Sequence, residues 1–109
     1  MEAWGSIEAR QLLEGIEQGT ISGSQIIDVR EFEEWDYYHL PGTTHVPMRQ
    51  VPGEQRIWEG DAPIYLLCAH GVRSEAVCRY LAEQGVRAPL WNVEGGMAAV
   101  AACRGFAYD

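Results

Sequence analysis

Three short apolar runs alternate with segments of helical pattern along this chain. The runs cover residues 25–29, 63–67 and 89–93, and none of them shows strict alternation of apolar and polar side chains. Apolar runs without alternation are typical of strands that are buried on both faces, as strands of parallel sheets are. Helical segments follow the runs, at 31 to about 35, at 74–84 and at 96–103. This order predicts an α/β fold with a mostly parallel sheet and helices on both of its faces.

Further elements are indicated at the N-terminus and in the middle of the chain. A first helix is predicted from Ser6, as its N-cap, to about Gln18, and Gly19 is suited to the C-terminal stop. Residues 43–46 are a candidate fourth strand, and the region of Val86 is expected to join the third apolar run.

The length and the charge of the chain exclude several classes of protein. A chain of 109 residues has room for one hydrophobic core, so a single domain over residues 1–109 is expected. A net charge of −8 disfavours binding to nucleic acid and to anionic lipid surfaces. The longest apolar stretch, 97–103, is far shorter than the roughly 20 residues that cross a bilayer, and no signal-peptide pattern is present. We therefore expect a cytoplasmic protein that binds neither nucleic acid nor membrane.

The three cysteines, Cys68, Cys78 and Cys103, are an odd number and have no Cys-x-x-Cys spacing. This pattern argues against a disulfide framework and against a thioredoxin-type redox pair, so reduced thiols are expected. Cys78 lies within a predicted helix and Cys103 near the end of another, and both are interpreted as structural. A metal site has no support beyond the single Cys-x-His spacing of Cys68 and His70, so neither a metal nor a cofactor is expected.

Residues 68–74 combine the features of a reactive cysteine. Cys68 ends a buried strand, and Ser74 begins the helix that follows a short loop. Backbone N–H groups of such a loop converge on an anion, the helix dipole adds partial positive charge, and both lower the pKa of a thiol. Cys68 is therefore the candidate nucleophile, Gly71 permits the unusual dihedral angles of the loop, and Arg73 and His70 add positive charge. The expected substrate-binding positions are Ala69, His70, Gly71, Val72 and Arg73.

Asp28 and Arg30 stand at the end of the first apolar run. A buried carboxylate is costly unless it is paired, so Asp28 is expected to stabilise nearby loops through an arginine or backbone N–H groups. Asp28, Arg30 and Ser74 are interpreted as structural support of the site. The acidic side chains of residues 31–36 are interpreted as a solvated face near a helix N-terminus.

Four blocks of the sequence, taken in order, resemble the signature blocks of single-domain rhodaneses. They are IDVRE at 27–31, HLPG and HVP within 39–47, CAHGVRS at 68–74 and NVEGG at 92–96. The resemblance covers nearly the whole chain and implies a rhodanese-like domain with about five strands and a catalytic Cys68 that carries sulfane sulfur as a persulfide. The chain departs from the family pattern at Tyr38, Ala69 and Val100. Because many thiosulfate-using members have a basic or polar side chain at the position of Ala69, a preference for the thiosulfate dianion is left open.

The resemblance implies a thiosulfate sulfurtransferase-like enzyme. The Cys68 thiolate is expected to take sulfur from thiosulfate or a similar small anionic donor and to pass it to cyanide or a thiol, including one on a protein. The alternatives are a phosphatase or arsenate reductase of the same fold, and a regulatory or protein-interaction module. The phosphatase pattern is Cys-x5-Arg, whereas Cys68 and Arg73 form Cys-x4-Arg, and interaction modules of this fold usually lack the cysteine. Sulfur transfer is therefore the favoured function.

Overall fold

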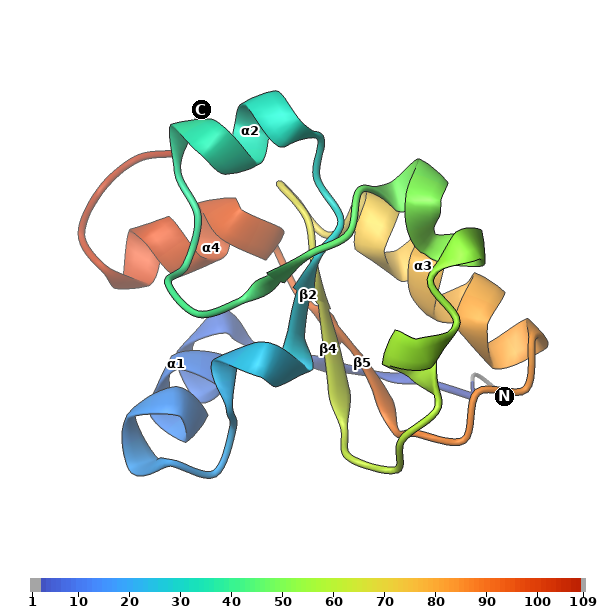
Figure 1. The fold of residues 1–109 in the computed structure, drawn as a ribbon. Coiled ribbons are helices and arrows are strands. Elements are labelled where there is room, and N and C mark those ends of the chain that lie inside the picture. The colour runs from blue at the N-terminus through green and yellow to red at the C-terminus, as the bar shows by residue number, and fades with distance from the viewer. Residues whose placement is uncertain (1–2, 109) are drawn as a thin grey trace.

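The computed structural model describes residues 3–108, and within them five strands form one sheet. The strands are β1 (Gly5–Ile7), β2 (Ile26–Asp28), β3 (Thr44–His45), β4 (Ile64–Leu67) and β5 (Leu90–Val93). Their order is β1-β5-β4-β2-β3, and every pair is parallel. Figure 1 shows β2, β4 and β5 side by side in the middle of the molecule. The predicted α/β class with a parallel sheet is confirmed.

Helices cover both faces of this sheet, as expected. The α-helices are α1 (Ala9–Gln18), α2 (Phe32–Tyr37), α3 (Val72–Glu83) and α4 (Gly96–Cys103). α1 packs against α4 on one face, whereas α3 packs against β4 and β5 on the other. In Figure 1, α3 accordingly lies to the right of the strands, and α1 and α4 lie to the left. Short 3-10 turns at Met48–Gly53 and Arg56–Trp58 lie beside α3.

Two hydrophobic clusters fill the spaces between the sheet and the helices. Leu66 of β4 packs in the cluster under α3 with Leu81, whereas Leu67 packs in the opposite cluster with Met97 of α4. Successive side chains of a strand point to opposite faces of the sheet. Because both faces of β4 are covered, the strand is buried along its whole length, and its sequence shows no alternation.

Three details differ from the prediction: the start of α1, the place of Val86 and the presence of β1. Ser6 lies in β1, and the N-cap of α1 is Glu8. The end of this helix agrees with the prediction, since Gly19 has a φ of 80° there. Val86 lies outside β5, in the turn after α3, where its N–H donates to Leu81 O over 3.2 Å. β1 itself was not predicted, because three residues are too few to show a pattern.

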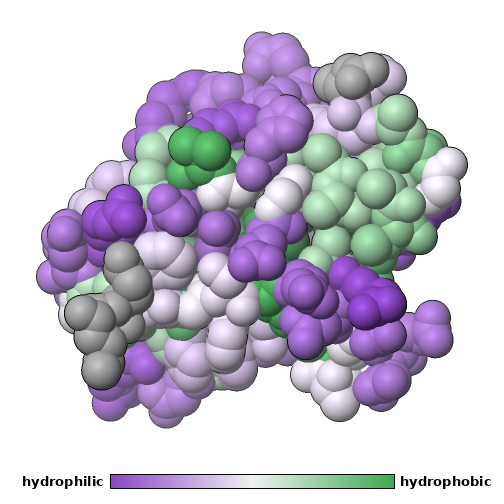
Figure 2. Space-filling model, turned by 180° about the vertical axis from the view of Figure 1, so that it is seen from behind, coloured by the Kyte–Doolittle hydropathy of each residue, from purple (hydrophilic) through white to green (hydrophobic). Residues whose placement is uncertain are grey.

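The surface seen from behind is largely hydrophilic, with one apolar area at the right where α4 lies (Figure 2). The sequence of α4 is rich in alanine, and Ala102 is exposed there. Within residues 3–108, none of the helices has the length and the apolar character that crossing a lipid bilayer requires.

Candidate active site

Cys68 directly follows β4, at the carboxyl end of the sheet. The chain then turns at Gly71, whose φ of 95° is unfavourable for a residue with a side chain. A Cβ at Gly71 would lie 3.2 Å from the backbone nitrogen of Gly95, so the turn also packs closely against the start of α4. α3 begins at Val72, two residues earlier than the predicted start at Ser74.

Residues 68–71 form the Cys68 loop, between β4 and α3. Two N–H groups at the start of α4 hold this loop. Met97 N donates to Cys68 O over 2.7 Å, and Ala98 N donates to Ala69 O over 3.0 Å. The approach is so close that a Cβ at Gly96 would lie 2.4 Å from Cys68 O. In a trans peptide the C=O and N–H groups point in opposite directions. These two bonds therefore turn the next N–H groups of the loop away from α4.

Cys68 is only 1% exposed, and its sulfur lies at the bottom of the loop. Gly71 N donates to Sγ over 3.1 Å, and Ser74 N donates to it over 3.3 Å. Burial raises the pKa of the thiol, but hydrogen bonds from Ser74 and from the His70 and Gly71 backbone outweigh it. The pKa of Cys68 therefore lies below its ordinary value, and the arrangement favours the thiolate, which is the reactive form.

A buried chain of hydrogen bonds supports the thiol. Ser74 Oγ lies 3.2 Å from Cys68 Sγ and donates to Asn92 Oδ1 over 2.5 Å. Asn92 Nδ2 in turn donates to Gly71 O over 3.2 Å, which connects β5 to the turn. Ser74 thus occupies the supporting place that the sequence predicts, whereas Asn92 was not among the predicted site residues. The available signal was a polar residue inside an apolar strand, at the start of the 92–96 block.

Alkylation of Cys68 by iodoacetamide is expected to have a pH midpoint below that of an unperturbed cysteine thiol, because the pKa of Cys68 is lowered. The reason is that the N–H groups and the Ser74 hydroxyl stabilise the thiolate. The Ser74 hydroxyl has a single proton, which it donates to Asn92 Oδ1 in the structure and must turn towards Sγ to stabilise the thiolate. Ser74→Ala removes this donor and is expected to raise the midpoint. Peptide mapping across a pH series measures the midpoint. The midpoint is compared rather than the rate of alkylation, because burial of the thiol by itself slows the reaction. A Cys68 midpoint at or above that of a free thiol would contradict the prediction.

Arg73 is paired with an acidic residue of α2. Its Nη1 and Nη2 donate to Glu34 Oε1 and Oε2, each over 2.8 Å. Glu31 of the same acidic run is paired with Arg49 at the surface. The interpretation of residues 31–36 as a merely solvated face is therefore wrong for Glu34, whose side chain is only 31% exposed. Arg73 reaches the loop region, as predicted, but its charge is shared with a carboxylate.

The Glu34 carboxyl is expected to titrate near pH 2. The hydrogen bonds from Arg73 lower its pKa from 4.5 to about 2, although burial works in the opposite direction. A carboxyl with a lowered pKa stabilises the folded state above its unfolded pKa, and this contribution is lost as the pH falls from about 4.5 through about 2. Carboxyl chemical shifts in an acid titration measure it. Arg73→Gln is expected to return the midpoint towards 4.5, and an unchanged midpoint in this variant would contradict the ion pair.

Arg30 is a fully buried charge that is paired with Asp28. Its Nη2 lies 2.8 Å from Asp28 Oδ2, and neither side chain is exposed. The guanidinium also donates to Tyr38 O over 2.7 Å, to Glu34 O over 3.3 Å and to the Tyr108 hydroxyl. The pair therefore connects β2, α2 and the C-terminal segment, which agrees with the structural role predicted for both residues.

The other two cysteines have different surroundings. Cys78 is buried in α3, and burial together with the charge of Glu75 raises its pKa to about 12. This agrees with a structural role. Cys103 is exposed at the end of α4, so its interpretation as a structural thiol is wrong. In the part of the chain that the structure describes, no group of three His, Cys, Asp or Glu side chains is arranged to hold a metal ion.

A pocket lies over the Cys68 loop, between α2 and the C-terminal segment. Its lining residues are Glu33, Glu34, Tyr37, Ala69, His70 and Tyr108. Of the predicted substrate-binding positions, His70 and Val72 are exposed, whereas Ala69 and Gly71 are buried. This space is the mouth pocket.

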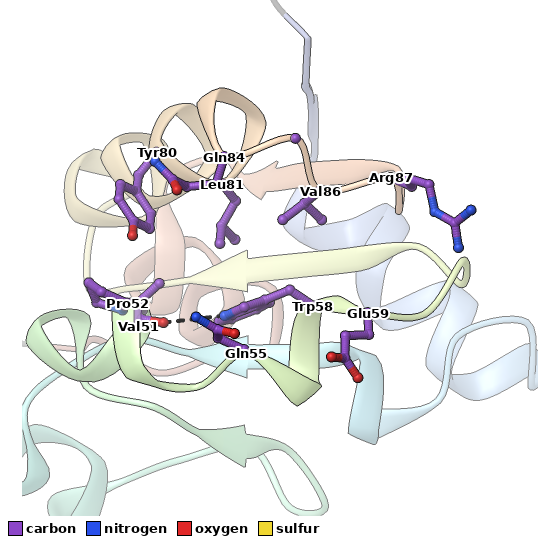
Figure 3. A pocket seen from close by; sticks show the side chains of 11 residues that line it. Val51, Pro52, Gln55, Trp58, Glu59, Tyr80, Leu81, Gln84, Val86 and Arg87 are labelled. Carbon is purple, nitrogen blue, oxygen red and sulfur yellow. Dashed lines mark hydrogen bonds between the residues drawn. The ribbon is translucent and has the colours of Figure 1, made fainter.

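A second groove, of about 480 Å³, lies between the 3-10 turns and the C-terminal half of α3 (Figure 3). Trp58 lines it, and its indole Nε1 donates to Val51 O over 3.3 Å. None of its lining residues belongs to the Cys68 loop. The groove is therefore separate from the candidate active site.

The fold and the site together define a class of protein. It is an α/β protein with a reactive-cysteine loop at the carboxyl end of a parallel sheet. Comparison with known families identifies it further: the profile described as Rhodanese-like domain matches residues 8–103. The chain therefore belongs to the rhodanese-like domain family, and the resemblance in the four sequence blocks is confirmed.

Several relatives carry sulfurtransferase names. "Putative sulfurtransferase YtwF" of Bacillus subtilis is 40% identical over 74 residues, which are 68% of this chain and 70% of that protein. "Thiosulfate sulfurtransferase GlpE" of Pseudomonas aeruginosa is 28% identical over 82% of this chain and 74% of that protein. A crystal structure of a rhodanese-like domain protein from Staphylococcus aureus matches with a TM-score of 0.79 and 33% identity, covering 92% of this chain and 91% of that one. Matches to curated relatives span between 38% and 74% of the relatives' lengths.

Proposed function

We propose that this protein is a sulfurtransferase that carries a sulfane sulfur as a persulfide on Cys68. The observation that carries the proposal is the position of Sγ, which accepts N–H donors from Gly71 and Ser74 at the start of α3. Donors in this position favour a thiolate that attacks a sulfur donor, and they then stabilise the anionic persulfide. The sulfurtransferase names of two relatives support the same reaction class.

The reaction has two displacement steps. The Cys68 thiolate attacks the outer sulfur of thiosulfate, the S–S bond of thiosulfate breaks, and sulfite leaves with the electron pair. Cys68 then holds a persulfide with one negative charge. Cyanide or an acceptor thiolate attacks the outer sulfur, thiocyanate or the acceptor persulfide leaves, and the Cys68 thiolate is restored. Atoms and charges balance in both steps without an added oxidant or reductant.

The loop residues have separate roles in this proposal. The backbone from Ala69 to Val72 surrounds the outer sulfur, and the N-terminus of α3 adds partial positive charge. Asp28 and Arg30 hold the surrounding segments in place through their buried ion pair. The acceptor, a small thiol or a thiol on a protein, approaches through the mouth pocket.

Intact-protein mass spectrometry tests the proposal. Incubation with a sulfane-sulfur donor is expected to add the mass of one sulfur atom, and cyanide is expected to remove it and to form thiocyanate. Thiosulfate and benzenethiosulfonate are both used, so that a poor donor is not mistaken for a lack of sulfur transfer. A folded protein that gains no sulfur from either donor would overturn the proposal.

The protein is expected to show no measurable turnover of aryl phosphates. Cys68 and Arg73 are spaced as Cys-x4-Arg, and both terminal nitrogens of Arg73 are bonded to Glu34 rather than directed at an anion. A phosphoryl group needs charged donors on its peripheral oxygens. A chromogenic aryl phosphate assay with Cys68→Ala as the blank measures this. Hydrolysis that depends on Cys68 would favour the phosphatase instead.

A further inference from the structure

We propose that Glu34 determines the donor class of this protein: by neutralising Arg73 it makes the site favour monoanionic, apolar sulfur donors over the thiosulfate dianion. The inference rests on the proposed sulfur transfer at Cys68 and concerns only which donors reach the thiol. The donors it favours are thiosulfonates and organic persulfides, in which the sulfane sulfur is attached to an alkyl or aryl carrier.

The two arginines of the site region are both paired with carboxylates. Arg30 is buried against Asp28, with 2.8 Å between Nη2 and Oδ2. Arg73 uses both Nη atoms on Glu34. Glu34 also connects the two arginines, because its backbone oxygen accepts a hydrogen bond from Arg30 Nη1. Neither guanidinium is therefore left to neutralise a substrate with two negative charges.

The mouth pocket adds further negative charge and apolar surface. Glu33 and Glu34 line it together with His70, and among residues 3–108 no arginine does so. Tyr37 also lines it and is 78% exposed, and Val72, which begins α3 directly after the loop, is 76% exposed. Coulomb repulsion is proportional to the charge of the incoming donor, so a dianion is repelled twice as strongly as a monoanion. An aryl group, in contrast, gains contact with the exposed aromatic and apolar side chains.

The proposed donors react by the same displacement as thiosulfate. The Cys68 thiolate attacks the outer sulfur of benzenethiosulfonate, the bond between that sulfur and the sulfonyl sulfur breaks, and benzenesulfinate leaves with the electron pair. The thiolate and the donor bring one negative charge each, and the persulfide and the sulfinate carry one each away. The step therefore balances without another reactant.

The test compares kcat/KM for thiosulfate, methanethiosulfonate and benzenethiosulfonate, with cyanide as acceptor and thiocyanate as the measured product. Methanethiosulfonate separates the effect of charge from that of the aryl group. The intrinsic reactivity of each donor cancels when that donor is compared between wild type and variant. Measurements at 0.15 M ionic strength, where the Debye length is about 8 Å, suppress the effect of distant charges.

Glu34→Gln keeps the shape of the side chain and frees the charge of Arg73. It is expected to raise kcat/KM about tenfold for thiosulfate and about threefold for methanethiosulfonate, because the electrostatic energy doubles with the donor charge. Asp36→Asn is the matched control: it removes a charge of the same sign from α2, and Asp36 neither lines the mouth pocket nor forms an ion pair among the described residues. Its effect is expected to stay below about twofold for both donors.

Val72→Arg is a second variant that leaves the Glu34 and Arg73 pair intact. It adds a cation at the exposed first position of α3, and it is expected to raise kcat/KM more for thiosulfate than for methanethiosulfonate. Equal changes for the two donors in both Glu34→Gln and Val72→Arg, or a loss with thiosulfate alone, would overturn the inference while leaving sulfur transfer established. If none of the three donors loads wild-type Cys68, the proposed function itself fails, and the inference fails with it.

Discussion

Cys68→Ala is expected to abolish both sulfur loading and the formation of thiocyanate. The persulfide is a covalent intermediate, so a variant without the sulfur atom has nothing to carry it. Cys68 is also the cysteine whose Sγ accepts backbone N–H donors from Gly71 of the loop and from Ser74 of α3. The mass gain should disappear completely, and thiocyanate should form only at the rate measured without protein. Intact mass and a colorimetric thiocyanate assay measure the two effects.

Cys103→Ala is the matched control for this experiment. Cys103 is exposed and open to reagents, but it lies at the end of α4 rather than in the loop. This variant should load one sulfur atom and turn over as wild type does. If Cys68→Ala kept the added sulfur and Cys103→Ala lost it, the reactive thiol would be the one on α4.

Asp28→Asn is expected to lower the free energy of unfolding by about 3–5 kcal/mol, because it leaves the buried Arg30 charge without its carboxylate. Neither side chain of this pair is exposed, so water cannot replace the missing charge. The loss is large against the total stability of about 5–15 kcal/mol that folded domains have. Urea unfolding followed by tryptophan fluorescence measures it.

Glu75→Gln is the control for Asp28→Asn. Glu75 and Arg79 form an ion pair on α3, but about half of each side chain is exposed. Exposed pairs of this kind contribute about 0–1 kcal/mol. Similar losses of stability in the two variants would mean that the Arg30 charge finds another partner when Asp28 is neutral.

Much of the fold could be predicted from the sequence because the signals are local. β4 and β5 lie within runs of apolar residues, and α4 spans the predicted residues 96–103. The thiol loop could be recognised for the same reason, since Cys68, Gly71 and the start of α3 are consecutive in the chain. β1 was missed because its three residues are recognisable only through their pairing with β5.

The sequence by itself thus determined the α/β class, the position of Cys68 at the end of a strand and the turn that surrounds its sulfur. Only the tertiary structure decided which charges remain available beside it. Glu34 and Arg73 are separated by 39 residues, and Arg30 and Tyr108 by 78. Such partners meet because the sheet order brings the ends of distant strands to one edge, and local patterns contain no information about that order. The charge of Arg73 could be predicted from the sequence, but its neutralisation by Glu34 could not.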